Sequence, residues 1–578
     1  MALPTPNIRK LTILAQDPSV RLGANGALLF AEVDVVAEQL AKGPTGYRVK
    51  VVDYDATAQR LYEDRVAYTD PDGAFLDPFA PRPGETAAAR EKRLLGDPNF
   101  HAQNVYAIVM RTLARFERAL GRRVCWSFGA HQLHVAPHAF CEGNAFYSEE
   151  DRGLLFGYFP GAGGGMVFTC LSHDVVAHET THALLDGLRN RFTEISLPDQ
   201  AGFHEGFADI VALLSGFAIP EVVEAALPPD ARRRRPGKAV RLIDARAVSE
   251  AALRESILLG LAKQVGSELS ATRGRALRRS VEIAPDRRLL DRPEYQEEHS
   301  RGEILVAAMM RTFLRLWVAR IAGLGRFEGR FYNRDRVIEE GTKLAEHLLT
   351  MAIRALDYCP PTDIDFGSFL AAMLTADAEV VPDDSRFGYR DELRRTFGAY
   401  GIAVPAEACD PATGTWLPFD GEVPILYTRT HFESMLHDPD EVFRFAWENR
   451  DALGIDFRGA IEVASVRPSV RQGPDGFFIR ETVCEYVQTA EIFGSECQYV
   501  LGFPLPAGMT TRQRITAYGS GAIVFDQYGR IKYHIANRLK GNPRQQRRLE
   551  YLCERGETST AARGRDRFGP IHRLRIGR

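Results

Sequence analysis

The stretch "SHDVVAHETTHALLDGL" (residues 172–188) carries two histidines, His178 and His182, four positions apart. On a helix, positions i and i+4 share one face, so both imidazoles can bind one metal ion at about 2.0–2.1 Å. Glu179 would then lie beside the ion, where its carboxylate can reach a water molecule without binding the metal. The flanking apolar residues predict a buried helix, in which such polar side chains are costly unless a ligand compensates. The motif therefore predicts a metal site with its own base.

A second helical pattern, "AGFHEGFADIVALL" (residues 201–214), follows after a short connection. A catalytic zinc ion takes three protein ligands and leaves one position open. Glu205 is expected to be the third ligand. Asp209, one turn later on the same face, is expected to accept the free ring N–H of a liganding histidine. The alternative is a helix with two solvated acids. It is less favoured because this helix follows the paired histidines so closely.

Size and composition describe an ordinary globular protein. The chain has 578 residues, 45% hydrophobic and 26% charged, which predicts two to four domains. The formal net charge of −3 predicts no nucleic-acid partner. The eight cysteines form no C-x-x-C pair, and no apolar run is long enough for a membrane span. The first residues lack the apolar core of a signal peptide, so the cytoplasm is the default expectation, with export by an unrecognised route left open.

Changes in periodicity and composition divide the chain into four regions. Residues 1–95 are predicted to be β-rich, 96–190 to form a strand-rich lobe ending in the His-Glu-x-x-His helix, 191–405 to form a helical lobe, and 406–578 to form an additional α+β module with a basic tail. "AQNVYAIVMRTLARFERALG" (102–121) predicts a helix that ends at glycine. "GAIVFDQYGRIKYHI" (521–535) predicts a β-hairpin.

Over residues 95–405 the chain resembles the thermolysin family of zinc metallopeptidases, the gluzincins, whose third zinc ligand is a glutamate on the next helix. Besides the two helices, the likeness rests on "GNAFYSEEDRGLLFGY" (143–158), "RALRRSVEIAPD" (275–286) and "EYQEEHSRGEILVAAMM" (294–310). The resemblance implies an α+β, two-lobed fold with a strand-rich N-terminal lobe, a helical C-terminal lobe and a cleft between them. The C-terminal module lies outside it.

The resemblance also implies a zinc endopeptidase that uses one zinc ion, held by His178, His182 and Glu205. Glu179 would take the proton of the attacking water, and His299 would stabilise the transition state. Glu294 would orient the ring of His299.

Substrate contacts follow from the same likeness. Asn144 and the backbone carbonyl of Ala145 would hold the substrate backbone, and Arg278 would bind a carbonyl on the leaving side. Leu277 and Val175 would line a pocket that prefers an apolar side chain there. A peptide or protein is therefore the expected substrate, and the oligomeric state is left open.

Three departures keep other functions open. The family's oxyanion tyrosine is missing, because no tyrosine lies between His182 and Glu205 and Phe192 occupies that stretch. His204 stands where the family often has asparagine. Calcium is not expected, because the segment after Gly216 lacks clustered acids. The alternatives are a weak or inactive peptidase fold used for binding, and a zinc aminopeptidase.

Another histidine-rich stretch, "HQLHVAPH" (131–138), could suggest a second metal site. On a strand, His131 and His134 would point to opposite faces, so an edge strand and loop is the preferred interpretation.

Overall fold

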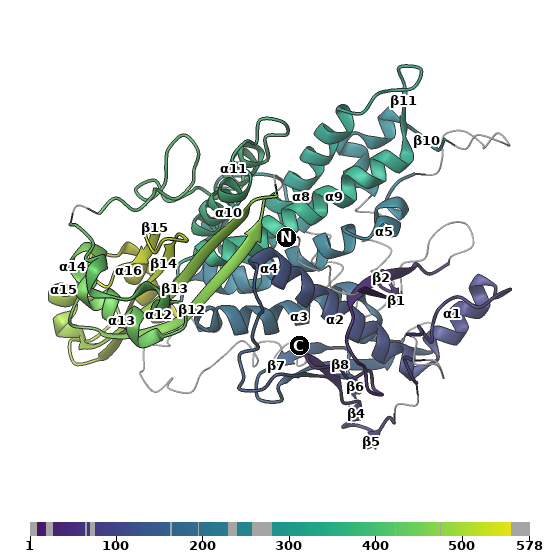
Figure 1. Cartoon of the computed structure of the whole chain (residues 1–578), viewed down its shortest axis with the longest axis horizontal. Helices are drawn as coiled ribbons and strands as arrows, with labels where there is room; N and C mark the ends of the chain where they lie inside the picture. The colour runs from purple at the N-terminus through teal and green to yellow at the C-terminus, as the bar shows by residue number, and fades with distance from the viewer. Residues whose placement is uncertain are drawn as a thin grey trace.

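The computed structural model of the chain describes residues 8–18, 27–63, 66–69, 75–161, 164–194, 196–228, 240–256, 280–421, 423–473 and 476–555. Helices and strands are both abundant, which confirms the α+β class (Figure 1). The described strands are β1 (Ile8–Leu14), β2 (Phe30–Val36), β3 (Val49–Val51), β4 (Tyr54–Asp55), β5 (Arg60–Leu61), β6 (Leu133–Phe140), β7 (Ala145–Ser148), β8 (Gly153–Pro160), β9 (Met166–Phe168), β10 (Leu242–Asp244), β11 (Phe331–Asn333), β12 (Ala460–Gln472), β13 (Phe478–Phe493), β14 (Arg514–Phe525) and β15 (Ile531–Asn537).

The described α-helices lie between groups of strands in the first half and dominate the middle of the chain. They are α1 (Ala87–Leu95), α2 (Pro98–Leu120), α3 (His173–Leu188), α4 (Pro198–Phe217), α5 (Pro220–Ala225), α8 (Glu298–Ala322), α9 (Arg334–Ala355), α10 (Phe366–Val380), α11 (Tyr389–Ala399), α12 (Phe432–Met435), α13 (Pro439–Glu448), α14 (Arg450–Leu453), α15 (Cys497–Val500) and α16 (Pro543–Glu554). In the described part of the chain, none of them combines the length and apolar character of a membrane-spanning segment.

One five-stranded sheet supports the N-terminal half. Its strand order is β3-β6-β8-β7, and β9 pairs with β8. β7 is therefore an end strand, and it pairs antiparallel with β8. β6 lies between β3 and β8, so the expectation of an edge strand at "HQLHVAPH" was wrong. Tertiary pairing decides this, since a strand's sequence does not specify how many neighbours it has.

The long helix α2 packs on this sheet. Asp97 caps its first turn by accepting a hydrogen bond from Asn99 N, and Pro98 occupies the first helical position, where its missing N–H costs nothing. Gly121 ends it in the left-handed conformation (φ 67°), which glycine adopts without strain. The predicted helix with its terminal glycine is confirmed, and most of its side chains are buried.

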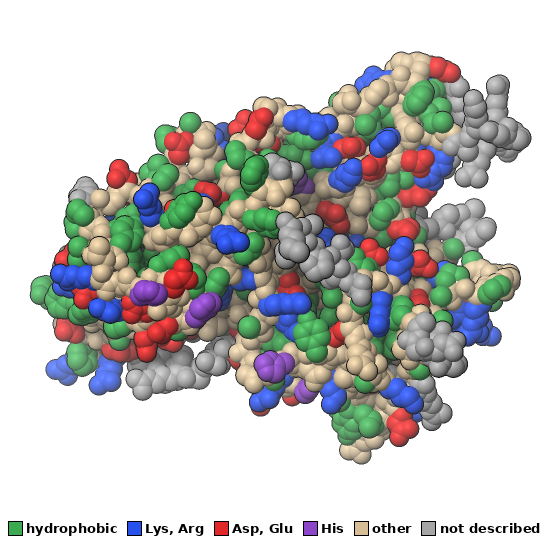
Figure 2. Space-filling model, viewed as in Figure 1, with side chains coloured by type: hydrophobic (Ala, Val, Ile, Leu, Met, Phe, Trp, Pro, Cys, Tyr) green, Lys and Arg blue, Asp and Glu red, His purple; other side chains and the backbone are tan. Residues whose placement is uncertain are grey.

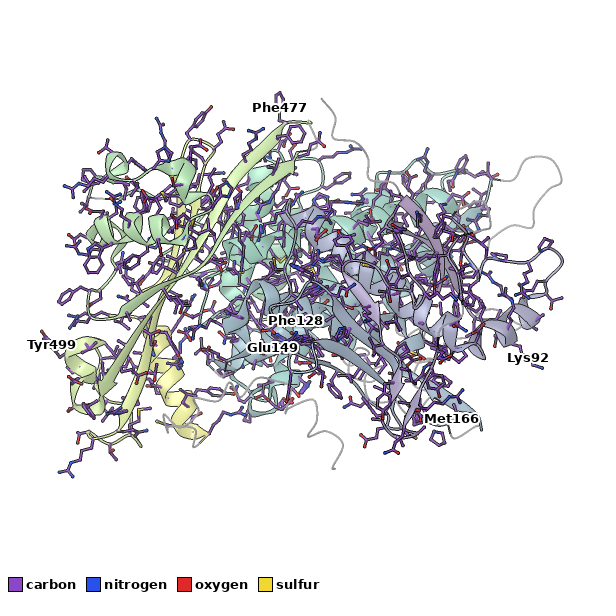
Figure 3. The ribbon with its side chains drawn as sticks, turned by 60° about the horizontal axis from the view of Figure 1, so that its bottom comes forward. Lys92, Phe128, Glu149, Met166, Phe477 and Tyr499 are labelled. Carbon is purple, nitrogen blue, oxygen red and sulfur yellow. The ribbon has the colours of Figure 1, made fainter. Side chains whose placement is uncertain are left out.

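The C-terminal residues form a second sheet, in the order β12-β13-β14-β15 with antiparallel neighbours. The predicted hairpin at 521–535 is confirmed as the end of β14 with β15. In Figure 3, Phe477 marks the β12–β13 turn and Tyr499 marks α15, at separate extremities of this module. The module has two hydrophobic clusters of its own, whose members include Phe445 and Phe525 in one and Leu501 and Ile515 in the other.

Buried ion pairs join this module to the helices. Arg471 of β12 is 1% exposed at its side chain and bonds Asp357, in the turn after α9, and Glu481 of β13. Asp357 also receives two bonds of 2.6 Å from Arg122. Although burial disfavours its charged form, Arg122 and Arg471 hold the pKa of Asp357 well below its ordinary value. The junction is therefore a charged, water-poor interface.

One large hydrophobic core runs through the remaining described elements and also takes in module side chains such as Val483 and Val524. It includes Leu11 and Val33 from the N-terminal strands together with Phe207 and Trp317 from the helices. The predicted region 1–95 thus shares its hydrophobic core with residues that follow the predicted boundary at position 95. Acidic and basic side chains are interspersed over the face seen in Figure 2, in keeping with the small net charge of −3.

Candidate metal centre and active site

Helices α3 and α4 bring the three predicted ligands together. His178 Nε2 lies 2.8 Å from His182 Nε2, and each lies 3.7 Å from an oxygen of Glu205. One ligand atom from each residue lies within 4.8 Å of the others. All three side chains are buried. The helix predicted for residues 172–188 is confirmed, since α3 begins at His173 and ends at Leu188.

Asp209 contacts the ring nitrogen of His178 that does not face the other two ligands. Its Oδ1 accepts a hydrogen bond of 2.7 Å from His178 Nδ1, which confirms the predicted contact. With Nδ1 carrying the proton, the lone pair of Nε2 points toward Glu205 and His182.

Glu179 lies between this cluster and the end strand of the sheet. Its Oε2 accepts a hydrogen bond of 3.2 Å from Tyr147 N in β7. The side chain is buried, and it is adjacent in sequence to His178. The carboxylate is therefore held at the strand edge where an extended peptide could add. In Figure 3, Glu149 marks the chain just after β7.

His299, in the first turn of α8, joins the cluster from a third helix. Its Nε2 lies 3.6 Å from Glu205 Oε2, and its side chain is mostly buried. Its ring is oriented by Glu297, whose Oε1 accepts a bond of 2.6 Å from Nδ1. Partial burial acts to raise the pKa of Glu297, but the hydrogen bond and charge of His299 and the Ser300 N–H outweigh it and lower this pKa to about 2.

Glu294 does not fill the role expected of it. It belongs to a short 3-10 turn (Pro293–Tyr295) before α8, and its carboxylate pairs with Arg292 at 3.5 Å. Glu297 is the helix cap, accepting from Ser300 N, so its carboxylate is directed into the first turn beside His299. The cap position two residues before His299 was the signal that could have identified Glu297.

Glycines allow α8 to approach α4, the helix that carries Glu205, closely. A Cβ on Gly302 would lie 2.8 Å from Gly202 O and 2.9 Å from Gly206 N, and a Cβ on Gly206 would lie 2.7 Å from Gly302 O. Any larger residue would push the helices apart. Because Gly302 is three residues after His299, this contact sets how near the histidine comes to Glu205.

The residues expected to contact substrate lie partly within the described chain. Ala145 begins β7 and is buried, and Asn144 precedes it, with its backbone O accepting from Gly157 N at 2.8 Å. Val175 is buried on α3, one turn before Glu179. Leu277 and Arg278 lie outside the described residues.

Two aromatic side chains mark the departures from the family pattern. Phe192 is fully buried and packs edge-on against Phe203 at 5.6 Å, so it belongs to the core and offers no hydroxyl. His204 stacks on the ring of His182 at 4.6 Å with an interplanar angle of 10°. The stack limits rotation of the His182 ring, a role that its position next to Glu205 did not suggest.

Comparisons with known proteins add no name to this arrangement: no family model matches the chain, and no curated protein matches it. The function is therefore inferred from the geometry and chemistry of the site.

Proposed function

We propose that this protein is a zinc-dependent endopeptidase with a thermolysin-like, two-lobed catalytic region. The observation that carries the proposal is the meeting of His178, His182 and Glu205 beside the carboxylate of Glu179, which itself contacts the end strand β7. A metal ligand set, a base and a strand edge thus lie together, which is what metal-assisted hydrolysis of an extended peptide requires.

The donor set fits zinc. Two imidazole nitrogens and a carboxylate are the ligands of many catalytic zinc sites, and the bond from His178 to Asp209 supplies the usual outer support. Zinc bound there would polarise a peptide carbonyl and make a bound water acidic.

The chain's own groups supply the remaining steps. Glu179 takes the proton of the attacking water and delivers it to the leaving amine. β7 holds the substrate as an added strand, and Val175 favours an apolar side chain on the leaving side. His299 donates a hydrogen bond to the developing oxyanion, with Glu297 fixing its ring.

A second candidate function is supported by Phe192. Because its ring is buried in the core and has no hydroxyl, Phe192 is no second oxyanion donor, and loss of one donor typically costs about 10²–10³ in rate. A slow or inactive peptidase fold that binds peptides is the resulting alternative.

Glu179→Gln tests the proposal. Zinc content should stay at the wild-type value while cleavage of a quenched peptide library falls to background, because the base is lost and the ligands remain. Glu150→Gln, an exposed carboxylate near β7, is the matched control and should cleave normally. Wild-type cleavage in the Glu179 variant would refute the assignment, and zinc-loaded wild-type protein without turnover would favour the binding protein.

Blocked peptides separate endopeptidase from aminopeptidase. An N-acetylated substrate should be cut as fast as the free peptide by an endopeptidase. An aminopeptidase needs the free amine, so acetylation would abolish its activity.

A further inference from the structure

A second cluster of ligand-type side chains lies in the N-terminal half, on α2, β6 and the turn Thr169–Leu171. One ligand atom each from His101, His138 and Cys170 lies within 4.8 Å of the others, and all three residues are buried. His101 Nδ1 and His138 Nε2 are 2.8 Å apart, the same separation as between the paired nitrogens of the first site. Ligands about 2.0–2.3 Å from a tetrahedral ion lie roughly 3.3–3.6 Å apart, so small shifts would accommodate one.

In each histidine, the ring nitrogen that faces away from the cluster has a polar partner, as is usual for a metal-bound imidazole. His138 Nδ1 lies 2.7 Å from Asp53 Oδ2, and the same carboxylate accepts the backbone N–H of residue 138. His101 Nε2 lies 2.9 Å from the carbonyl oxygen of Leu95. A carboxylate and a backbone carbonyl are the two commonest outer partners of zinc-bound imidazoles.

Counting protons favours an ion over a simple hydrogen-bonded pair. The Leu95 carbonyl can only accept, so a neutral His101 carries its proton on Nε2 and has a bare lone pair on Nδ1. Without a metal, the contact between His101 Nδ1 and His138 Nε2 needs a proton on one of them, so one of the two rings is an imidazolium in the interior or Asp53 is protonated. With a divalent cation, both rings are neutral and both inward lone pairs have a partner.

The surroundings suit a structural ion. Phe168 packs on His101 at 4.6 Å and on His138 at 5.2 Å, and Tyr62 packs on His138 at 4.9 Å. Phe168 ends β9, the strand that Met166 marks in Figure 3. This aromatic wall limits the access of water and substrate.

The cluster also includes a residue of the turn that leads into α3. Cys170 lies three residues before the start of α3, and its carbonyl accepts a bond of 2.9 Å from Asn104 of α2. We propose that His101, His138 and Cys170 bind a second zinc ion, which ties α2 and β6 to the segment leading into the His-Glu-x-x-His helix.

Metal counting on the full chain tests this inference independently of peptidase activity. After zinc loading and gel filtration, elemental analysis should find two zinc ions per chain. Cys170→Ser and His178→Ala should each retain one, and the double variant none. Cys359→Ser, another fully buried cysteine, is the matched control and should retain two.

Cobalt substitution identifies the site by its sulfur. Only a thiolate ligand produces the intense near-ultraviolet charge-transfer band of Co²⁺, and the first site has none. The band should appear in wild type and in His178→Ala, and vanish in Cys170→Ser. Wild-type protein that binds a single zinc ion and shows no such band would overturn the proposal, whatever the variants do.

Discussion

Asp209 accepts a hydrogen bond from His178 across the contact of α3 and α4, with 2.7 Å between Oδ1 and Nδ1. The acceptor lies one helical turn after Glu205, so one helix supplies both a candidate ligand and the group that orients another. This arrangement couples the tautomer of the histidine to the packing of the two helices.

Asp209→Ala should weaken zinc binding about 10–100-fold, because loss of such an outer partner lets the His178 ring rotate and lowers its basicity. Competition with a chromogenic chelator measures the affinity. Glu221→Ala, an exposed acid at the start of α5, should leave the affinity unchanged. Equal affinity in the Asp209 variant would mean that the hydrogen bond does not support the metal.

Glu297→Ala should lower kcat/KM about 10–100-fold with zinc content unchanged, because His299 loses the carboxylate that holds its ring 3.6 Å from Glu205. Glu294→Ala is the control, since Glu294 pairs with Arg292 instead and should act like wild type. A larger effect at position 294 than at 297 would reverse this assignment.

The same carboxylate predicts a pH dependence. Because the folded pKa of Glu297 is lowered from 4.5 to about 2, its charged form stabilises the fold above pH 4.5. That contribution is lost as pH falls from 4.5 toward about 2. The difference in urea midpoint between wild type and Glu297→Ala should therefore narrow over this interval. A difference that widens on acidification would contradict the sign.

Gly302→Ala should destabilise the protein by about 1–3 kcal/mol, because the new methyl group would overlap Gly202 O and Gly206 N. It should also lower activity by moving His299. Gly398→Ala in α11 is the matched control, since its Cβ would meet nothing within 4 Å, and it should be neutral or slightly stabilising. Denaturant unfolding measures both. Equal stability of the two variants would show that α4 and α8 can separate without cost.

Arg471→Met should cost roughly 3–5 kcal/mol in unfolding free energy, because it leaves Asp357 and Glu481 buried with fewer cationic partners. Arg123→Met removes an exposed partner of Glu117 and should cost less than about 1 kcal/mol. Chemical denaturation of both variants compares the two environments. A small effect at Arg471 would mean that water or Arg122 compensates for the missing charge.

Local patterns in the sequence determined much of this protein. The pairs His178–His182 and Glu205–Asp209 could be named because i and i+4 positions meet on any helix, and Glu179 because it follows the first histidine of the motif. The helix ending at Gly121 and the hairpin of β14 and β15 followed from cap and turn chemistry. Within His178–His182, the cap of α2 and the hairpin turn, the groups are few residues apart, so the local backbone sets their geometry. The meeting of Glu205 and Asp209 with His178 depends instead on the packing of α3 against α4.

Only the tertiary structure decided contacts between distant segments. The inner position of β6 depends on β3 and β8, and the choice of Glu297 over Glu294 depends on where α8 begins relative to the preceding turn. His101, His138 and Cys170 are scattered along the chain and meet because α2 packs against the sheet. Periodicity encodes which face of an element is buried, whereas the partner that buries it is selected by the packing of the whole core.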